Sequence, residues 1–230
     1  MKKLLFCLLF LLLPVFAFAG PVYKGTLSGD ISGPFLASTN PDGSVFILGW
    51  SNENHMGSGV LVHPASGGGF FQINLLGVRY EGTVSDDSIS VTVSMDGQSA
   101  SGTGYPMDNS AMLSYAGSYR ADLSGDVRGT MDIGISGTTP GALVVDGYRH
   151  PDNAYFPGLG IVSDTGMFLA VSQDFYVTIK GQVNGSSISG QWADVVYELF
   201  GTFATPGTPA PSPGGSSDSS SSGCFIDNLR

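Results

Sequence analysis

An eleven-residue segment that occurs twice constrains the fold more than any other feature of the chain. Tyr23–Gly33 reads YKGTLSGDISG, and Tyr119–Gly129, 96 positions later, reads YRADLSGDVRG. Solenoid proteins repeat every ~20 to 50 residues, so this longer spacing indicates a duplicated half-domain or domain. The chain is therefore expected to contain two copies of one structural unit.

Residues 1–19 have the pattern of a secretory signal peptide. A basic start is followed by the apolar run Leu4–Phe16, and Ala17–Ala19 places small residues at the two positions that a signal peptidase reads. We expect cleavage after Ala19 and export to the periplasm, the cell surface or the extracellular space. No transmembrane helix is expected after cleavage, because the apolar run is shorter than the ~20 residues of a spanning helix.

The mature chain is acidic and has a single cysteine. The formal net charge is −10, and loss of Lys2 and Lys3 with the signal makes it −12. Such a surface repels phosphate backbones, and the chain has no Lys/Arg cluster to neutralise them, so nucleic acid is excluded as a partner. Because only Cys224 remains after removal of Cys7, no internal disulfide can form and the body must fold on its hydrophobic core.

Apolar residues come in short alternating runs separated by turn residues, a pattern typical of an all-β fold. No window outside the signal carries an apolar stripe of helical period. We predict an internally duplicated antiparallel β-meander that forms a barrel or a sandwich, with the two meanders joined edge to edge, because closure removes exposed strand edges. The strands predicted in the first half are 44–50, 59–62, 70–76, 80–84 and 89–93.

The second half follows the same plan. Ser44–Trp50 matches Gly141–Tyr148, which places Tyr148 opposite Trp50. The other matched blocks are Gly57–Leu61 with Gly158–Val162, Tyr80–Val84 with Ile179–Val183, and Ser88–Ser90 with Ser187–Ser189. The chain divides into a signal at 1–19, a first β repeat at 20–104, a connection at 105–117, a second β repeat at 118–204, a linker at 205–222 and a tail at 223–230. Apolar residues in the connection favour one body over two separate domains.

The carboxy-terminal part differs abruptly in composition. Residues 205–222 read TPGTPAPSPGGSSDSSSS and contain no large apolar side chain, so a disordered linker is expected. The end that follows begins with Gly223–Ile226 and resembles the short Gly-Cys-Phe-Ile tails of some secreted bacterial proteins. This resemblance implies a sorting or attachment signal in which Cys224 is modified or cross-linked. The alternative is an unprocessed tail with a free thiol.

Two polar loops are weak candidates for a metal site. Glu53 and His55 follow Trp50, while His150 and Asp152 follow Tyr148 at corresponding places. A carboxylate and an imidazole in each loop could hold a divalent cation or bind a sugar. The loops lack the spacing of zinc sites and the ligand order of calcium loops, so the alternative of ordinary polar turns is favoured. No cofactor is assigned.

Three aromatic residues are candidates for stacking a ligand: Trp50, Tyr148 and Trp192. Aromatic side chains in short strands are nevertheless more often part of the core. Asp30 and Asp126 are repeat partners, and a pair of acids could hydrolyse glycosides, but aspartate after glycine is also ordinary turn chemistry. No residue is assigned a catalytic role.

These features favour an exported, non-enzymatic β module that is displayed at or attached to a surface. It would bind a cell-envelope or extracellular partner through its tail or loops, or have a structural role. The first alternative is a barrel that carries a small apolar ligand, which requires small and aromatic inward residues around a void. An outer-membrane β-barrel and a secreted hydrolase are less favoured; membrane strands need about nine to eleven residues.

Overall fold

The computed structural model describes residues 20–64, 69–75, 77–95, 97–150 and 154–207. Within these ranges the chain forms two eight-stranded antiparallel sheets and one short helix. The prediction of an all-β, internally duplicated meander is confirmed. The predicted signal peptide, Asp152 and the tail with Cys224 lie outside the described residues.

The first sheet is a meander that curls until its first and last strands pair. Its order is β4-β3-β2-β1-β8-β7-β6-β5, and β1 is hydrogen-bonded to β8. β4 and β5 come into contact but share no ladder in the described part of the chain, so this barrel has one open seam. The strands are β1 Val22–Gly29, β2 Gly33–Thr39, β3 Val45–Trp50, β4 Gly57–Val62, β5 Phe70–Leu75, β6 Val78–Val84, β7 Ile89–Met95 and β8 Gln98–Pro106.

The second sheet repeats this meander and closes completely. Its order is β10-β11-β12-β13-β14-β15-β16-β9, and β9 pairs with both β10 and β16. β12 and β13, the equivalents of β4 and β5, form a regular ladder. The strands are β9 Gly117–Gly125, β10 Arg128–Ile135, β11 Ala142–His150, β12 Ala154–Val162, β13 Met167–Ser172, β14 Val177–Asn184, β15 Ser187–Asp194 and β16 Leu199–Ala204.

The interior of each barrel follows from alternation along the strands. In β7 every second residue is buried, because side chains of a strand point alternately to the two faces of the sheet. The first interior includes Tyr23, Phe35, Ile47, Val60, Phe71, Tyr80 and Ile89. The second includes Ala121, Met131, Ile133, Val145, Phe168, Ile179, Trp192 and Phe203.

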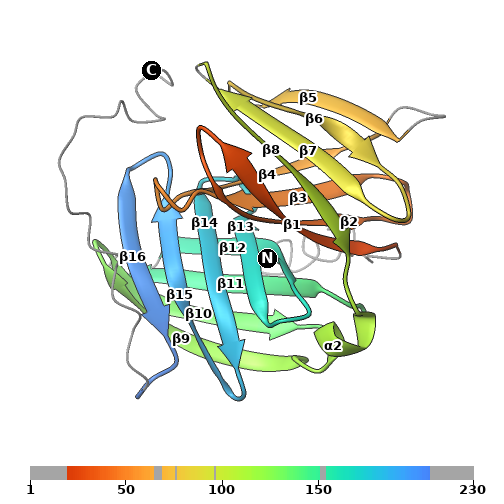
Figure 1. Ribbon diagram of the computed structural model, residues 1–230. Helices are drawn as coiled ribbons and strands as arrows, with labels where there is room; N and C mark the ends of the chain where they lie inside the picture. Colours follow the sequence, from red (N-terminus) through yellow and green to blue (C-terminus); the bar gives the residue numbers. More distant parts are fainter. Residues whose placement is uncertain (1–19, 65–68, 76, 96, 151–153, 208–230) are drawn as a thin grey trace, which may run out of the picture.

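A third apolar core lies between the two barrels. It joins the outer faces of β2 and β3 to those of β12 and β13. β3 is therefore buried on both faces, which explains why its sequence VFILGW is apolar almost throughout. The barrels form one body, stacked as in Figure 1 with the first barrel above the second. The expectation that the meanders join edge to edge is wrong, because each curls on itself and the two pack face to face.

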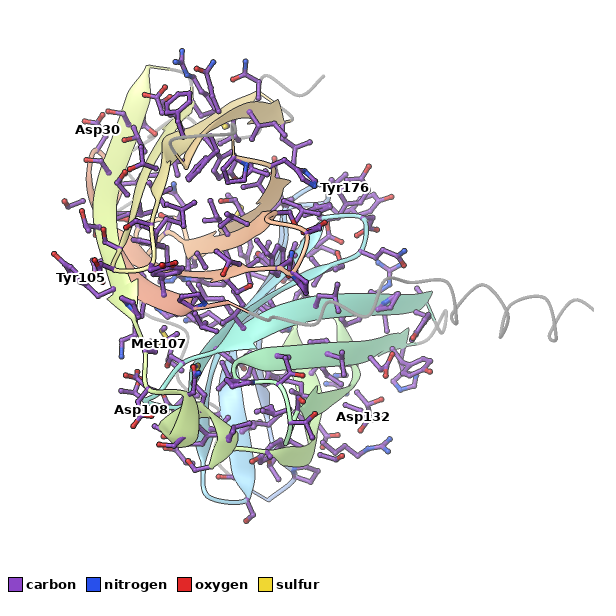
Figure 2. All side chains as sticks on the ribbon, turned by 90° about the vertical axis from the view of Figure 1, so that its right-hand side faces the viewer. Asp30, Tyr105, Met107, Asp108, Asp132 and Tyr176 are labelled. Carbon is purple, nitrogen blue, oxygen red and sulfur yellow. The ribbon has the colours of Figure 1, made fainter. Side chains whose placement is uncertain are left out.

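The connection between the barrels contains helix α2, Asn109–Leu113, which the sequence did not indicate. The carboxylate of Asp108 caps it by accepting the backbone N–H of Ser110 at 2.9 Å. Met112 is fully buried between the barrels, as its apolar character predicted, whereas Tyr105 is 64% exposed. Figure 2 shows Tyr105 pointing outward, and Met107 and Asp108 at the junction of the barrels.

Strand register defines which residues of the two barrels are equivalent. Gly49 and Trp50 of β3 correspond to Gly147 and Tyr148 of β11, as predicted for the aromatic pair. The β3–β4 and β11–β12 ladders then make Gly57 of the first barrel equivalent to Tyr155 of the second. The predicted match of Gly57–Leu61 with Gly158–Val162 is therefore wrong by three residues. It followed a shared Gly-x-Gly pattern rather than the register.

Candidate ligand-binding cavity in the first barrel

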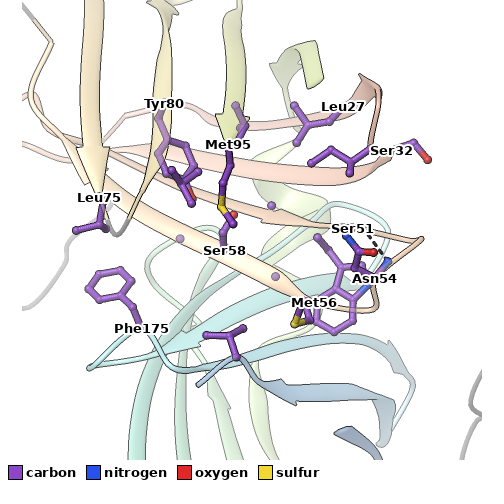
Figure 3. A pocket seen from close by; sticks show the side chains of 18 residues that line it. Leu27, Ser32, Ser51, Asn54, Met56, Ser58, Leu75, Tyr80, Met95 and Phe175 are labelled. Atoms are coloured by element: carbon purple, nitrogen blue, oxygen red, sulfur yellow. Dashed lines mark hydrogen bonds between the residues drawn. The ribbon is translucent and has the colours of Figure 1, made fainter. Parts of the chain in front are cut away.

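An apolar cavity of about 140 Å³ opens at the seam of the first barrel. It extends from the barrel interior, past the start of β4, to the boundary with the second barrel. Figure 3 shows Leu75, Tyr80 and Met95 on one side of it, Phe175 on the other, and Ser58 between them. Among the described residues, its lining contains no Asp, Glu, Lys, Arg or His.

The cavity exists because Ser58 stands where the second barrel has a large aromatic residue. In the second barrel Phe156 pairs with Gly147, and its ring covers that glycine so closely that a Cβ there would collide with it. In the first barrel Ser58 pairs with Gly49 and leaves the corresponding space free. A Cβ on Gly49 would be 3.6 Å from its nearest neighbour, the Cδ1 atom of Leu27. The same pair of positions is therefore filled in one barrel and hollow in the other.

A second difference in size enlarges the same region. By register, the cross-strand pair Phe71 and Gly82 of the first barrel is equivalent to the pair Phe168 and Gly181 of the second. In each barrel the phenyl ring lies over the glycine. Continuing along the next ladder, Val93 is equivalent to Trp192. Val93 lines the cavity, whereas Trp192 fills the second core.

The unpaired seam gives the cavity its entrance. It is bounded by Gly57–Gly59 at the start of β4 and by Leu75 at the end of β5, the ends of these strands that lie away from their connecting loop. Phe175 and Val195, from two loops of the second barrel, complete the lining. Phe175 has a φ of 65°, a left-handed conformation that costs energy for a bulky residue. The second barrel thus contributes side chains to a site in the first.

The two loops that reach the entrance are held in place by hydrogen bonds. Ser172 Oγ donates to the carboxylate of Asp174 and accepts the backbone N–H of Val177 at 2.8 Å. Val195 N–H donates to the carbonyl of Tyr176 at 2.9 Å, which joins the two loops to each other. Both loops also carry exposed aromatic side chains, Tyr176 and Tyr197, which do not line the cavity. Hydrogen bonds therefore fix the two loops that bring Phe175 and Val195 to the cavity.

Few polar groups line the cavity. Burial raises the pKa of Tyr80 to about 12, although its hydrogen bond with the Ser58 side chain acts in the opposite direction. Tyr80 therefore stays neutral at physiological pH. Trp50, which is 2% exposed and lines the cavity, has an indole Nε1–H with no hydrogen-bond partner. The described lining is thus neutral and mainly apolar, and its polar side chains include Tyr80, Ser58, Ser51 and Asn54.

The first of the predicted metal candidates, Glu53, is used within its own loop. Its carboxylate accepts hydrogen bonds from the backbone N–H of Ser32 at 2.9 Å and from the hydroxyls of Ser32 and Ser51. Partial desolvation acts to raise the pKa of Glu53, but these hydrogen bonds outweigh it and the pKa is lowered. Glu53 therefore joins the β1–β2 turn to the β3–β4 loop.

The two histidine loops do not occupy corresponding environments. His55 borders a shallow groove of about 400 Å³ beside Asp126, Trp192 and Phe200 of the second barrel. His150 is exposed at the end of β11, opposite Arg128. Within the described ranges, no three His, Cys, Asp or Glu side chains come together in a way that could hold a metal ion.

The three aromatic candidates do not form a common exposed platform. Trp50 and Trp192 are 2% and 5% exposed, whereas Tyr148 is 42% exposed and packs against Tyr155 with ring centroids 5.0 Å apart. Of the three, Trp50 is the one that lines the apolar cavity. Ligand stacking by Tyr148 or Trp192 stays a prediction.

Asp30 and Asp126 have the same structural part in the two barrels. The carboxylate of Asp30 accepts the backbone N–H of Ser99, and that of Asp126 accepts the backbone N–H of Phe200, both at 2.8 Å. The backbone N–H of Asp30 also donates to the carbonyl of Ser99, and that of Asp126 donates to the carbonyl of Phe200. The turn interpretation of these residues is confirmed, and it explains why the repeat retains Ser-Gly-Asp twice.

The sequence analysis missed the residues that make the cavity, above all Gly49, Ser58 and Tyr80. The signal was present in the duplication, since an alignment in the correct register sets Ser58 against Phe156 and Val93 against Trp192. Two large-to-small differences on the same inner face indicate a void. The three-residue error at β4 concealed the first of them.

Comparison with known proteins assigns no family to the chain. None of the protein-family models matches the sequence, and none of the curated proteins is significantly similar to it. Among the described residues, no helix is both long and apolar enough to cross a membrane. The class that the fold and the site define is a double β-barrel with an apolar cavity in one barrel, and its function is inferred from that cavity.

Proposed function

We propose that this protein is an exported, non-enzymatic binding module that holds a small apolar ligand in its first barrel. The observation that carries the proposal is the apolar cavity of about 140 Å³ at the open seam. An engineered cavity of about 150 Å³ with apolar walls binds benzene, so the volume suits a molecule of roughly that size. The described residues that line it include no charged side chain and no arrangement of acid, base and nucleophile, which favours binding over catalysis.

The test is binding of ethylbenzene, a neutral hydrocarbon that fits this volume. Ethylbenzene at increasing concentration is expected to raise the melting temperature of the mature protein saturably, because a ligand that binds only the folded state stabilises it by mass action. The binding constant from calorimetry gives an independent measurement. Failure of ethylbenzene and of similar small apolar probes to bind would remove the proposal.

Ser58→Phe locates the binding site, because it introduces the side chain that fills the equivalent place in the second barrel. This variant is expected to lose the thermal shift with ethylbenzene while keeping the fold. Ser101→Phe is the matched control, since Ser101 is exposed on β8 and does not line the cavity. Equal binding by wild type and Ser58→Phe would place the ligand elsewhere and contradict the proposal.

The same proposal includes retention at a cell surface through Cys224, on the basis of the tail sequence. Intact mass and cell fractionation of the wild type are compared with those of a Cys224→Ser variant. We expect the wild type in the envelope with a shifted mass, and the variant released with an unmodified mass. Recovery of both in soluble form at the unmodified mass would contradict attachment and leave the ligand-binding proposal untouched.

A further inference from the structure

A groove of about 400 Å³ lies at the boundary between the two barrels, outside the first-barrel cavity. Its walls come from β15, β16 and the β9–β10 turn of the second barrel, and from Asn54 and His55 in the β3–β4 loop of the first. Its volume falls within the range of about 300 to 1,000 Å³ that is typical of sites for small molecules. The groove is a candidate for a second binding site, which goes beyond the proposed function.

Strand register defines which side chains of the second barrel face this groove. Trp192 belongs to the second core, so its neighbour Gln191 projects from the outer face of β15. Gln191 pairs with Thr202 of β16, and Phe200, two positions before Thr202, projects to the same side. All three line the groove, and the side chain of Phe200 is 36% exposed. An amide and an accessible phenyl ring therefore lie on the same outer surface.

A contact between the barrels holds the β3–β4 loop beside this surface. Lys180, the cross-strand partner of Gln191, donates from Nζ to Asn52 Oδ1 at 3.1 Å and does not itself line the groove. The loop continues to Asn54 and His55, which do line it. His55 has a φ of 53°, a left-handed conformation that is uncommon for residues other than glycine. The loop is thus fixed where it can present an amide and an imidazole to a ligand.

The polar side chains of the groove are available for binding. Within the described ranges, the side chains of Asn54, His55 and Gln191 make no hydrogen bond. Each amide offers a donor and an acceptor, and so does a neutral imidazole. Asp126 adds a carboxylate, whose Oδ2 accepts the backbone N–H of Phe200 at 2.8 Å. Among the described residues, no Lys or Arg lines the groove, so an anionic ligand would have no cationic partner there.

We infer that this groove binds a neutral saccharide. A sugar ring has an apolar C–H face, which can pack on the exposed ring of Phe200. Its hydroxyls both donate and accept hydrogen bonds, which matches the amides of Asn54 and Gln191 and the imidazole of His55. A peptide backbone fits less well, because β16 pairs with both β15 and β9 and offers no free strand edge to it.

The inference is tested by titrating the mature protein with neutral sugars, detected by saturation-transfer NMR. The probes are methyl β-glucoside, methyl β-galactoside, methyl α-mannoside and N-acetylglucosamine, with glucuronate and glucosamine as charged analogues. At least one neutral sugar is expected to bind, more tightly than either charged analogue. Its dissociation constant should be nearly the same at low and high salt, because salt screens interactions between charges and the ligand has none.

Phe200→Ala and Gln191→Ala locate the site, because each removes one of the contacts that define it. Either variant is expected to weaken sugar binding by at least about 5-fold. Phe70→Ala and Gln72→Ala are the matched controls, since both residues are exposed on β5 and do not line the groove. Neither Phe200 nor Gln191 lines the first-barrel cavity, so their variants should still bind ethylbenzene.

Three results would overturn the inference: binding of none of the sugars, equal binding by the wild type and both groove variants, or tighter binding of glucosamine than of every neutral sugar. If Phe200→Ala does not fold, Gln191→Ala decides the question, because Gln191 belongs to none of the three apolar cores. Ethylbenzene binding is measured separately, so failure of this inference leaves the proposed function intact, and the converse also holds.

Discussion

The two barrels of this protein have the same eight-stranded meander but differ at one seam and in one part of the core. β12 and β13 form a ladder and close the second barrel, whereas β4 and β5 do not. Inside, Phe156 and Trp192 fill the second barrel where Ser58 and Val93 leave space in the first. The difference in closure and the difference in filling occur in the same barrel.

The difference in closure coincides with a difference in the length of the equivalent strands β4 and β12. β12 continues to Val162, which pairs with Phe168 of β13, but β4 ends at Val62, two residues before Pro64. By register, Pro64 stands at the position of Val162, whose N–H donates to the carbonyl of Gly141 on the β11 side and not to β13. The duplicated unit is thus closed and filled in the second barrel, and open and hollow in the first. The comparison teaches that one fold can be densely packed in one copy and can leave a cavity in the other, for which ligand binding is proposed above.

The largest expected effect is that of opening the filled barrel with Phe156→Ser. Phe156 is partly buried against the second core, so its loss is expected to lower the free energy of unfolding by about 2 to 3 kcal/mol, less than a fully buried phenylalanine. The variant should also acquire a second site for ethylbenzene, because the space over Gly147 becomes free. Chemical denaturation measures the first effect, and the stoichiometry of ethylbenzene binding measures the second.

Phe70→Ser is the control for this variant, since Phe70 is a phenylalanine of the first barrel that is 46% exposed. Its replacement should change the free energy of unfolding by no more than about 0.5 kcal/mol. If Phe156→Ser cost as little as Phe70→Ser and bound no second ligand, the filling of the two barrels would not differ in the way inferred from the register.

The seam itself is tested by amide hydrogen exchange. The hydrogen bond from Val84 N to Gly69 O and the alternation of antiparallel pairs direct the N–H groups of Gln72 and Asn74 away from β6, toward the side where β5 has no partner strand in the described part of the chain. Their equivalents Leu169 and Val171 pair with β12. Exchange at Gln72 and Asn74 should be faster by a factor of at least about 100, because amides outside a ladder open at almost no free-energy cost.

Similar protection at the four amides would mean that β4 and β5 pair in solution. The first barrel would then be closed, and a ligand would have no entrance through the seam. Repeating the measurement with saturating ethylbenzene sharpens the comparison. A ligand in the cavity should slow exchange around Leu75 and Gly57–Gly59, which bound the entrance, and leave Leu169 and Val171 unchanged.

Much of the fold was predictable from the sequence because its signals are local. Alternating burial in β7 and turn residues at Asn40–Gly43 each depend on a few neighbouring residues. The closure of one barrel and not the other was not predictable in this way. It depends on pairing between β4 and β5 and between β12 and β13, which a strand's own sequence does not specify.

The candidate site was less predictable, because it depends on how the two copies align. Residues that look functional alone, such as Glu53 and Asp126, prove to hold loops and turns together. The cavity is made by residues that look ordinary, such as Ser58, whose meaning comes from comparison with Phe156 in the correct register. Size differences between repeats would have located it, but the shared Gly-x-Gly pattern led to the wrong alignment of β4.

The smallest expected effects are those of Asp30→Ala and Asp126→Ala, which test whether the two barrels are equivalent outside the cavity. Each carboxylate accepts one backbone N–H at 2.8 Å, and both lie at exposed turns. Loss of one such hydrogen bond should lower the free energy of unfolding by about 1 kcal/mol in either barrel. Asparagine variants, which keep an oxygen acceptor, should recover part of the loss. Denaturation would contradict this equivalence if Asp126→Ala lowered the free energy of unfolding much more than Asp30→Ala. Damage to the open barrel would then leave the measured transition unchanged, and the closed barrel alone would determine the stability of the whole chain.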